Sequence, residues 1–205
     1  MTEMNEISSH TKPKLFSPIP PDRYISVPNM LTLIRFGLSL SFFVLAAVKM
    51  NPKYNYIGLV IHWLGDFSDG FFARTFKQET IFGAEIDIIA DRVGFLFFYV
   101  VYLMFNPQVF IPVAIFIINF SFLDFYLSNQ FLKYDIISIN YFYKVDRTVH
   151  KLNFSPVGKF CNTVIVTLGL IFLPQLWIFI TVYALGLVGV KSYSIFLLSR
   201  IKKPA

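Results

Sequence analysis

The chain has 205 residues, of which 56% are hydrophobic and 15% are charged, and its formal net charge is +6. A soluble domain of this length carries nearer a quarter charged residues, so the composition excludes an ordinary soluble domain and favours a bilayer protein. The single Cys161 excludes an intramolecular disulfide framework. The basic residues are scattered between apolar segments, without a nucleic-acid-binding motif. We therefore expect partners that are anionic lipids or phosphate-bearing substrates, and no nucleic acid.

The chain begins with a polar segment, residues 1–26, which contains four prolines and has no long apolar run. We expect it to be a cytosolic arm and not a cleavable signal peptide. A membrane-spanning helix needs about 20 mostly apolar residues. Six segments approach this requirement: 29–48, 56–74, 84–105, 108–128, 157–173 and 176–198. The one sizeable loop is expected between Ser128 and Pro156. The predicted fold is all-α, with six transmembrane helices in one integral membrane domain, residues 27–205.

The distribution of positive charge predicts how these helices are oriented. Most of the 18 Lys and Arg residues fall in the arm, the second connection, the long fourth connection and the C-terminal tail. Only Lys49 and Lys53 fall in connections on the opposite side. Basic residues gather on the cytoplasmic side of membrane proteins. We therefore expect both termini to lie in the cytoplasm.

Four aspartates lie in or beside apolar helices: Asp66, Asp69, Asp87 and Asp91. An ionisable side chain at a helix centre costs about 2.5–3.5 kcal/mol on insertion scales. One such aspartate is as often a structural hydrogen-bonding group, but four in this pattern indicate function. Each pair is spaced to share one helix face, and the expected topology brings both pairs to the cytoplasmic ends of adjacent helices. Hard oxygen ligands select Mg²⁺ or Mn²⁺, which can also bind a diphosphate.

The same residues carry a resemblance. The pattern D-x2-D-G-x2-A-R-x8-G-x3-D-x3-D, which starts at Asp66 and ends at Asp91, is similar to the signature of the CDP-alcohol phosphatidyltransferases, with all eight fixed positions present. The segment from Pro28 to Arg35 also resembles the start of the first helix in that family. The resemblance implies a homodimeric phospholipid-synthesising enzyme of the bacterial inner membrane, with its active site facing the cytoplasm. Such an enzyme moves a phosphatidyl group from CDP-diacylglycerol to a small alcohol and releases CMP.

The resemblance also implies roles for individual residues. Asp66, Asp69 and Asp87 would hold the metal, while Asp91 would take the proton from the acceptor hydroxyl and also touch the metal. The nucleotide and its diphosphate would contact Asn29, Thr32, Gly70, Ala73, Arg74 and Gly83. A phosphorylated acceptor would be held by Lys133, Arg147 and Lys151, with Lys159 beside them, although a solvated basic loop explains these residues equally well.

The acceptor is left open by the signature, because relatives use glycerol 3-phosphate, inositol, inositol phosphate or serine. Arg92, directly after the last aspartate, looks more like the inositol-using members, or it pairs with an acid. Asp124 and Lys191 are expected to pair with each other, ahead of a role in the acceptor pocket. His62 is expected to bond to a neighbouring helix and not to act as a ligand.

Two other functions remain. A CDP-choline or CDP-ethanolamine phosphotransferase shares the signature and uses diacylglycerol as the acceptor. A cation- or proton-coupled transporter could also carry aspartates inside the membrane. A transporter would be expected to show repeat symmetry or broken helices at mid-membrane, whereas this sequence has no repeat and its acids cluster at one end. Metal-dependent release of CMP would separate an enzyme from a transporter.

Overall fold

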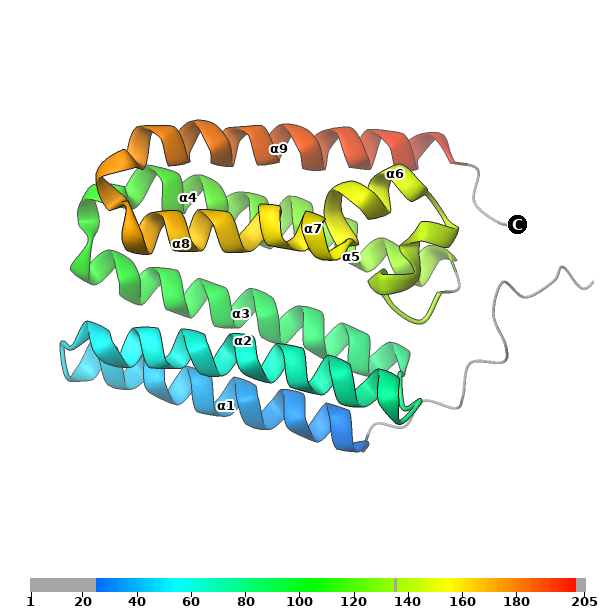
Figure 1. The fold of residues 1–205 in the computed structure, drawn as a ribbon, viewed down its shortest axis with the longest axis horizontal. Helices are drawn as coiled ribbons and strands as arrows, with labels where there is room; N and C mark the ends of the chain where they lie inside the picture. The colour runs from blue at the N-terminus through cyan, green and yellow to red at the C-terminus, as the bar shows by residue number, and fades with distance from the viewer. Residues whose placement is uncertain (1–24, 135, 202–205) are drawn as a thin grey trace, which may run out of the picture.

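The computed structural model describes residues 25–134 and 136–201, and every element in that part of the chain is helical (Figure 1). The predicted all-α fold is confirmed. All but the last two residues of the predicted N-terminal arm lie outside the described residues. The helices form two halves, one built from the first three helices and one from the remaining elements.

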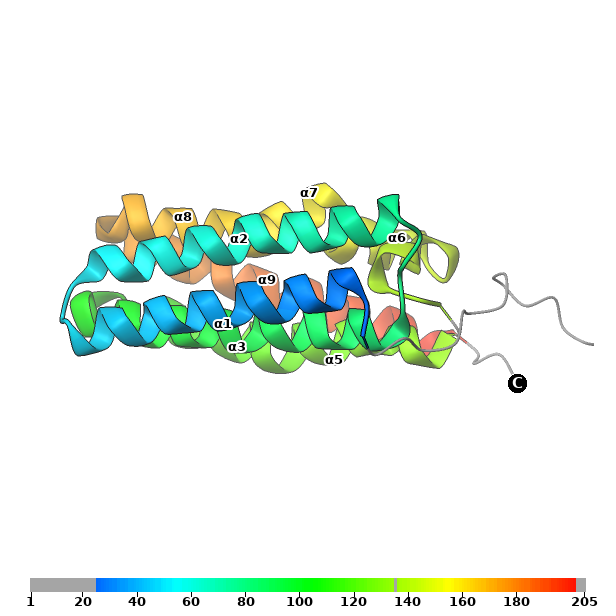
Figure 2. The same cartoon turned by 90° about the horizontal axis from the view of Figure 1, so that it is seen from below.

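The N-terminal half consists of three long helices, α1 (Val27–Val48), α2 (Pro52–Thr75) and α3 (Ile81–Phe105). Each begins at a side chain that accepts a hydrogen bond from a free backbone N–H of the first turn: Ser26, Asn51 and Thr80. In α1 and α2 a proline follows in the first turn, where its missing N–H costs nothing. The caps fix where each helix begins, and the three helices pack along one another (Figure 2).

The C-terminal half combines one long helix with many short segments. Its longest helix is α9 (Trp177–Arg200), which follows the 3₁₀ turn Pro174–Leu176. The other elements are the 3₁₀ segments Pro107–Val109, Asn129–Tyr134 and Ile139–Lys144; the helices α4 (Phe110–Ile118), α5 (Phe125–Ser128), α6 (Arg147–Val149), α7 (Pro156–Lys159) and α8 (Ile165–Phe172); and the π-helical segments Asn119–Asp124, His150–Phe154 and Phe160–Val164. Two of the π-helical segments thus lie between α-helices, α4 and α5 or α7 and α8, and the third directly follows α6.

The stretch from Ser128 to Pro156 is therefore not the loop that the sequence predicts. Most of its described residues lie in short 3₁₀, α and π segments. The physical reason is burial, because Phe131, Phe142 and Phe154 point into a core together with Ile88 of α3. Its polar and aromatic composition suggested a loop, but the buried aromatic side chains hold it against the helix bundle.

Four helical segments among the described residues are long and apolar enough to cross a membrane: Val27–Val48, Ile81–Phe105, Pro107–Tyr134 and Pro174–Arg200. A fifth is obtained if Arg147–Phe154 and Pro156–Phe172, which meet at an angle of 44°, count as one broken span. The chain is thus an all-helical integral membrane protein. Helix α2 is not among these spans, so the predicted sixth span is not confirmed. The start of α1 and the end of α9 lie at the same end of the molecule (Figure 1), although the side of the membrane stays a prediction.

The two halves are joined through α3 and α8 by packing and hydrogen bonds. Tyr99 lies 2.8 Å from Thr167, oxygen to oxygen, and the Tyr102 hydroxyl donates to the carbonyl of Leu170 at 2.6 Å. Phe43 of α1 and Phe116 of α4 belong to the same buried cluster. Within a bilayer, packing and hydrogen bonds, rather than exclusion of water, hold helices together. These contacts therefore fix α3, which carries half of the motif acids, against the C-terminal half.

Candidate active site

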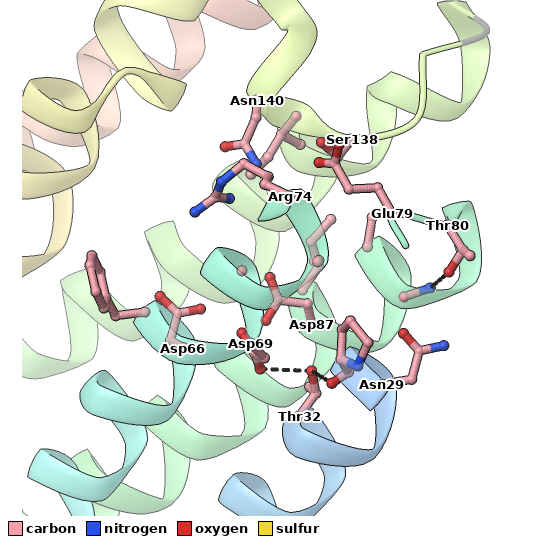
Figure 3. A pocket seen from close by; sticks show the side chains of 18 of the residues that line it. Asn29, Thr32, Asp66, Asp69, Arg74, Glu79, Thr80, Asp87, Ser138 and Asn140 are labelled. Carbon is pink, nitrogen blue, oxygen red and sulfur yellow. Dashed lines mark hydrogen bonds between the residues drawn. The ribbon is translucent and has the colours of Figure 1, made fainter. Parts of the chain in front are cut away.

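The carboxyl groups of α2 and α3 converge near one end of the molecule. One carboxylate oxygen from each of Asp66, Asp69 and Asp87 lies within 4.8 Å of the other two. Figure 3 shows these three side chains close together, with Thr32 of α1 beside them. The convergence predicted from the spacing of the acids is confirmed for this group.

These three carboxylates fit a divalent cation. They offer hard oxygen atoms, the ligands that Mg²⁺ and Mn²⁺ prefer. Asp69 is buried, whereas the side chains of Asp66 and Asp87 are 46% and 39% exposed, so the group opens to one side. The Thr32 hydroxyl donates to Asp69 Oδ2 at 2.7 Å, which fixes the buried member of the set. Asp66, Asp69 and Asp87 could therefore hold a metal ion.

Arg35 of α1 lies among all four motif aspartates, a feature that sequence reasoning missed. Its guanidinium is 2.8 Å from Asp69, 2.5 Å from Asp87, 3.2 Å from Asp91 and 3.5 Å from Asp66. The side chain is 4% exposed. An arginine inside an apolar helix costs free energy unless an acid pairs with it. Its presence in the sequence of α1 could therefore have indicated a contact with the motif acids.

A cavity of about 560 Å³ opens beside these acids. Its lining contains every residue predicted to bind the nucleotide and its diphosphate: Asn29, Thr32, Gly70, Ala73, Arg74 and Gly83. Asp66, Asp69 and Asp87 form part of the same wall. Residues of the C-terminal half, among them Ser138 and Asn140, lie across from Arg74 (Figure 3). We name this space the first cavity.

A second cavity of about 350 Å³ adjoins the first. Asp66 and Asp87 line both cavities, while Asp91 lines only the second one. The remaining wall includes Arg92 and Asp124 together with residues from the π-helical segments of the C-terminal half. Asp66 and Asp87 thus lie where a space lined by the predicted nucleotide residues meets a space that contains the predicted base.

Comparison with known proteins identifies the family. The family model described as CDP-alcohol phosphatidyltransferase matches residues 25–190. The chain belongs to the CDP-alcohol phosphatidyltransferase family.

Curated relatives within the family are named CDP-diacylglycerol–glycerol-3-phosphate 3-phosphatidyltransferase. The Cereibacter sphaeroides protein is 33% identical over 96 residues, which cover 44% of this chain and 43% of the relative. The Aquifex aeolicus protein is 34% identical over 96 residues, or 46% of this chain and 52% of the relative. The Sodalis glossinidius protein is 40% identical over 72 residues, or 34% and 39%. The matches therefore span about half or less of these relatives' length. No solved structure matches the chain.

Two glycines allow the helices that carry the family signature to approach closely. A Cβ atom on Gly83 would lie 2.5 Å from Asn29 Oδ1, and one on Gly65 would lie 2.5 Å from Arg35 Cβ. Neither position has room for a methyl group without movement of its neighbour. Gly83 thus allows α1 to pack closely against the start of α3. Gly65 allows the aliphatic part of the Arg35 side chain to pack against α2.

A second group of charges lies in the C-terminal half of this family member. Arg92 donates to Asp124 at 2.5 Å and to the Ser128 hydroxyl at 3.0 Å. The Lys191 ammonium donates to the other oxygen of Asp124. The predicted pairing of Asp124 with Lys191 is confirmed, and Arg92 also pairs with that acid. His62 is buried, with Nε2 3.4 Å from Asp91.

The basic residues predicted to hold the acceptor are not brought to the acids. Lys133, Arg147 and Lys151 are absent from the lining of both cavities. Lys159 lines both cavities, and its ammonium lies 3.1 Å from Asn140 Oδ1. The sequence analysis placed all four basic residues in one region, but of these only Lys159, which follows Pro156, lines the cavities.

The two halves also meet at the edge of the first cavity. The Tyr141 hydroxyl, in the segment Ile139–Lys144, donates to Glu79 Oε2 at 2.6 Å. Glu79 lines the first cavity and precedes α3. The hydrogen bond to the carboxylate, together with burial, raises the pKa of Tyr141 to about 12. Tyr141 therefore remains a neutral donor at physiological pH and ties the two halves together.

Proposed function

We propose that this protein transfers a phosphatidyl group from CDP-diacylglycerol to a small alcohol and releases CMP. The observation that carries the proposal is the pair of adjoining cavities that Asp66 and Asp87 both line. A displacement at phosphorus needs one space for the leaving nucleotide and another for the incoming hydroxyl. The cavities supply both, and each contains the residue types its ligand requires.

The first cavity would hold the CDP part of the donor. Arg74 offers several N–H donors to the diphosphate oxygens, a geometry that guanidinium groups provide well. Gly70 and Ala73 have little or no side chain, so the nucleotide can approach the backbone of α2 closely. Asn29 and Thr32 line the part of the cavity formed by α1. The diphosphate would then lie next to Asp66, Asp69 and Asp87.

The second cavity would hold the acceptor alcohol. Asp91 would accept the proton of the acceptor hydroxyl as its oxygen forms a bond to the lipid-side phosphorus. The bond between that phosphorus and the bridging oxygen breaks, and the electron pair leaves with CMP. Mg²⁺ or Mn²⁺ held by Asp66, Asp69 and Asp87, and touched by Asp91, would neutralise the negative charge of the diphosphate. Arg92 is already paired with Asp124, so it serves to shape this wall.

We propose glycerol 3-phosphate as the acceptor. The curated relatives carry that substrate in their names. Lys159 offers a positive charge at the second cavity for a phosphate group. The arginine after the last aspartate suggested inositol, but Arg92 is engaged by Asp124 and Ser128. The pairing accounts for that arginine without an inositol ligand.

The decisive experiment is CMP release by the detergent-purified chain given CDP-diacylglycerol and Mg²⁺. The acceptors would be glycerol 3-phosphate, inositol, inositol phosphate and serine, with Asp91→Asn as the blank. We expect release with glycerol 3-phosphate, loss of release in EDTA and recovery with Mg²⁺ or Mn²⁺. Release with another acceptor would overturn the substrate and keep the class. Absence of both turnover and nucleotide binding would overturn the class.

A separate arm of the assay addresses the remaining alternatives. A CDP-choline or CDP-ethanolamine phosphotransferase would release CMP from those nucleotides with diacylglycerol as the acceptor, and a transporter would release none. The family resemblance also leads us to propose a homodimer in the bacterial inner membrane with both cavities open to the cytoplasm. The mass of the detergent-solubilised protein and the labelling of single cysteines introduced into the predicted cytoplasmic loops test these points.

A further inference from the structure

We propose that Arg35 is a built-in counter-ion of the aspartate cluster, and that its guanidinium competes with the divalent cation for the same carboxylates. The inference deepens the proposed function, because it takes from that function the assignment of Asp66, Asp69 and Asp87 to a metal. It adds a residue that sets how tightly the metal binds.

The first argument is the number of carboxylates that one guanidinium contacts. Nε of Arg35 donates to Asp69, and Nη2 donates to Asp87 and Asp91 while lying 3.5 Å from Asp66. A guanidinium has five N–H donors in a fixed plane, so it can serve several carboxylates at once. Arg35 therefore offsets part of the repulsion within a group of four acids.

The second argument is that the metal and Arg35 need the same ligands. The three acids grouped within 4.8 Å of one another, Asp66, Asp69 and Asp87, are all contacted by Arg35. A divalent cation bound there would lie beside a fixed positive charge, and like charges at this range repel strongly in a partly buried site. Binding of the metal must therefore weaken the contacts of the guanidinium with these oxygens.

The third argument is that Arg35 cannot simply leave. Its stem lies against the backbone of α2 at Gly65, where even a methyl group would clash. Nη1 lies 3.4 Å from the carbonyl oxygen of His62, and the residue is 4% exposed. The positive charge therefore stays next to the cluster whether or not the metal is bound. Arg35 thus acts through the aspartates as a positioning residue and lowers the affinity of the site for metal.

The test measures metal binding and stability, without turnover. The detergent-purified full chain would be titrated with Mn²⁺ in the absence of nucleotide, and free Mn²⁺ would be followed by electron paramagnetic resonance. We expect Arg35→Gln to bind Mn²⁺ at least about tenfold more tightly than the wild type. In EDTA its Tm should fall by roughly 5 °C, because the acids lose their counter-ion. The deficit in Tm should shrink when Mn²⁺ saturates the site.

Lys191→Met is the matched control, because it removes a buried cation that contacts Asp124 and none of the motif acids. It should lower Tm equally in EDTA and in Mn²⁺ and should leave Mn²⁺ affinity within about twofold. If Arg35→Gln does not fold, Arg35→Lys keeps the charge but reaches fewer carboxylates, and it should bind Mn²⁺ about threefold more tightly.

Whichever Arg35 variant folds, the proposal would be overturned if that variant bound Mn²⁺ no more tightly than the wild type. It would also be overturned if the wild type bound no Mn²⁺. These results are distinct from failure of the proposed function. A wild type that binds Mn²⁺ under the control of Arg35 but releases no CMP would overturn only the reaction. A wild type that releases CMP while Arg35→Gln binds Mn²⁺ more weakly would overturn only the role of Arg35.

Discussion

The two halves of the molecule differ in how they are built and in what they contribute. The half formed by α1, α2 and α3 has long unbroken helices and carries all the motif acids, Arg35 and most residues of the first cavity. The other half is interrupted by three π-helical segments and supplies much of the wall of the second cavity. Regular helices hold charges at fixed spacings, whereas π turns displace side chains and often occur at functional sites. The comparison suggests that the first half fixes the chemistry and that the second half shapes the acceptor space.

The strongest test of this division is Asp91→Asn. Loss of the general base should reduce CMP release by about 10²–10⁴-fold, while binding of CDP-diacylglycerol persists because Asp91 does not line the first cavity. Turnover and nucleotide binding would be measured on the same preparation. Glu85→Gln is the control, because Glu85 is in the same helix but lines neither cavity. Full activity of Asp91→Asn would remove the base from the mechanism.

The next largest effect is expected from the buried charges of the C-terminal half. Lys191→Met leaves Asp124 with Arg92 alone and should lower the free energy of unfolding by about 3 kcal/mol. The double variant Lys191→Met/Asp124→Leu should not recover that loss, because Arg92 would then lose its own carboxylate partner. Unfolding in mixed micelles measures both. A single variant as stable as the wild type would show that the pair does not hold this half together.

A smaller effect should separate two neighbouring lysines. Lys159→Gln should raise the KM for glycerol 3-phosphate about tenfold, because Lys159 lines the second cavity. Lys151→Gln should change it by less than about twofold, since Lys151 lines neither cavity. Steady-state kinetics with the acceptor as the varied substrate measures both variants. Equal effects would mean that a diffuse basic surface, and not one position, attracts the acceptor.

The smallest effect concerns the contact between the halves at Tyr141. Tyr141→Phe should lower stability by about 1 kcal/mol near neutral pH, through loss of the hydrogen bond to Glu79. The raised pKa of Tyr141 means that this stabilisation is fully present below about pH 10 and disappears as the pH rises through about 12. Phenolate absorbance of the wild type minus the variant follows the titration. A Tyr141 that titrates near pH 10 would contradict the contact.

The sequence predicted the N-terminal half well because its evidence is local. The spacing of Asp66, Asp69 and Asp87 sets their helix faces, and a hairpin of two helices brings those faces together. Arg35 could not be placed in the same way. Its contact with the acids depends on how closely α1 approaches α2 at Gly65, a tertiary property that spacing along one helix does not reveal.

The C-terminal half was predicted less well because long-range packing overrides its local pattern. The segment after Ser128 reads as a polar loop, but burial of Phe131 and Phe142 folds it into short helical turns. The difference between Lys151 and Lys159 arises from a turn at Pro156 between them. Composition marks both lysines as basic residues near the membrane surface, and only the fold separates them.

The position of Asp66 and Asp87 where the two cavities adjoin has a consequence for the order of events. Donor and acceptor would have to be bound together, so initial-rate plots should intersect, as they do for a ternary complex. With the hydroxyl entering from one cavity and CMP departing into the other, the configuration at a phosphorus made chiral with oxygen isotopes should invert. A phosphatidyl group held on the protein between two half-reactions would instead give parallel plots and retention of configuration.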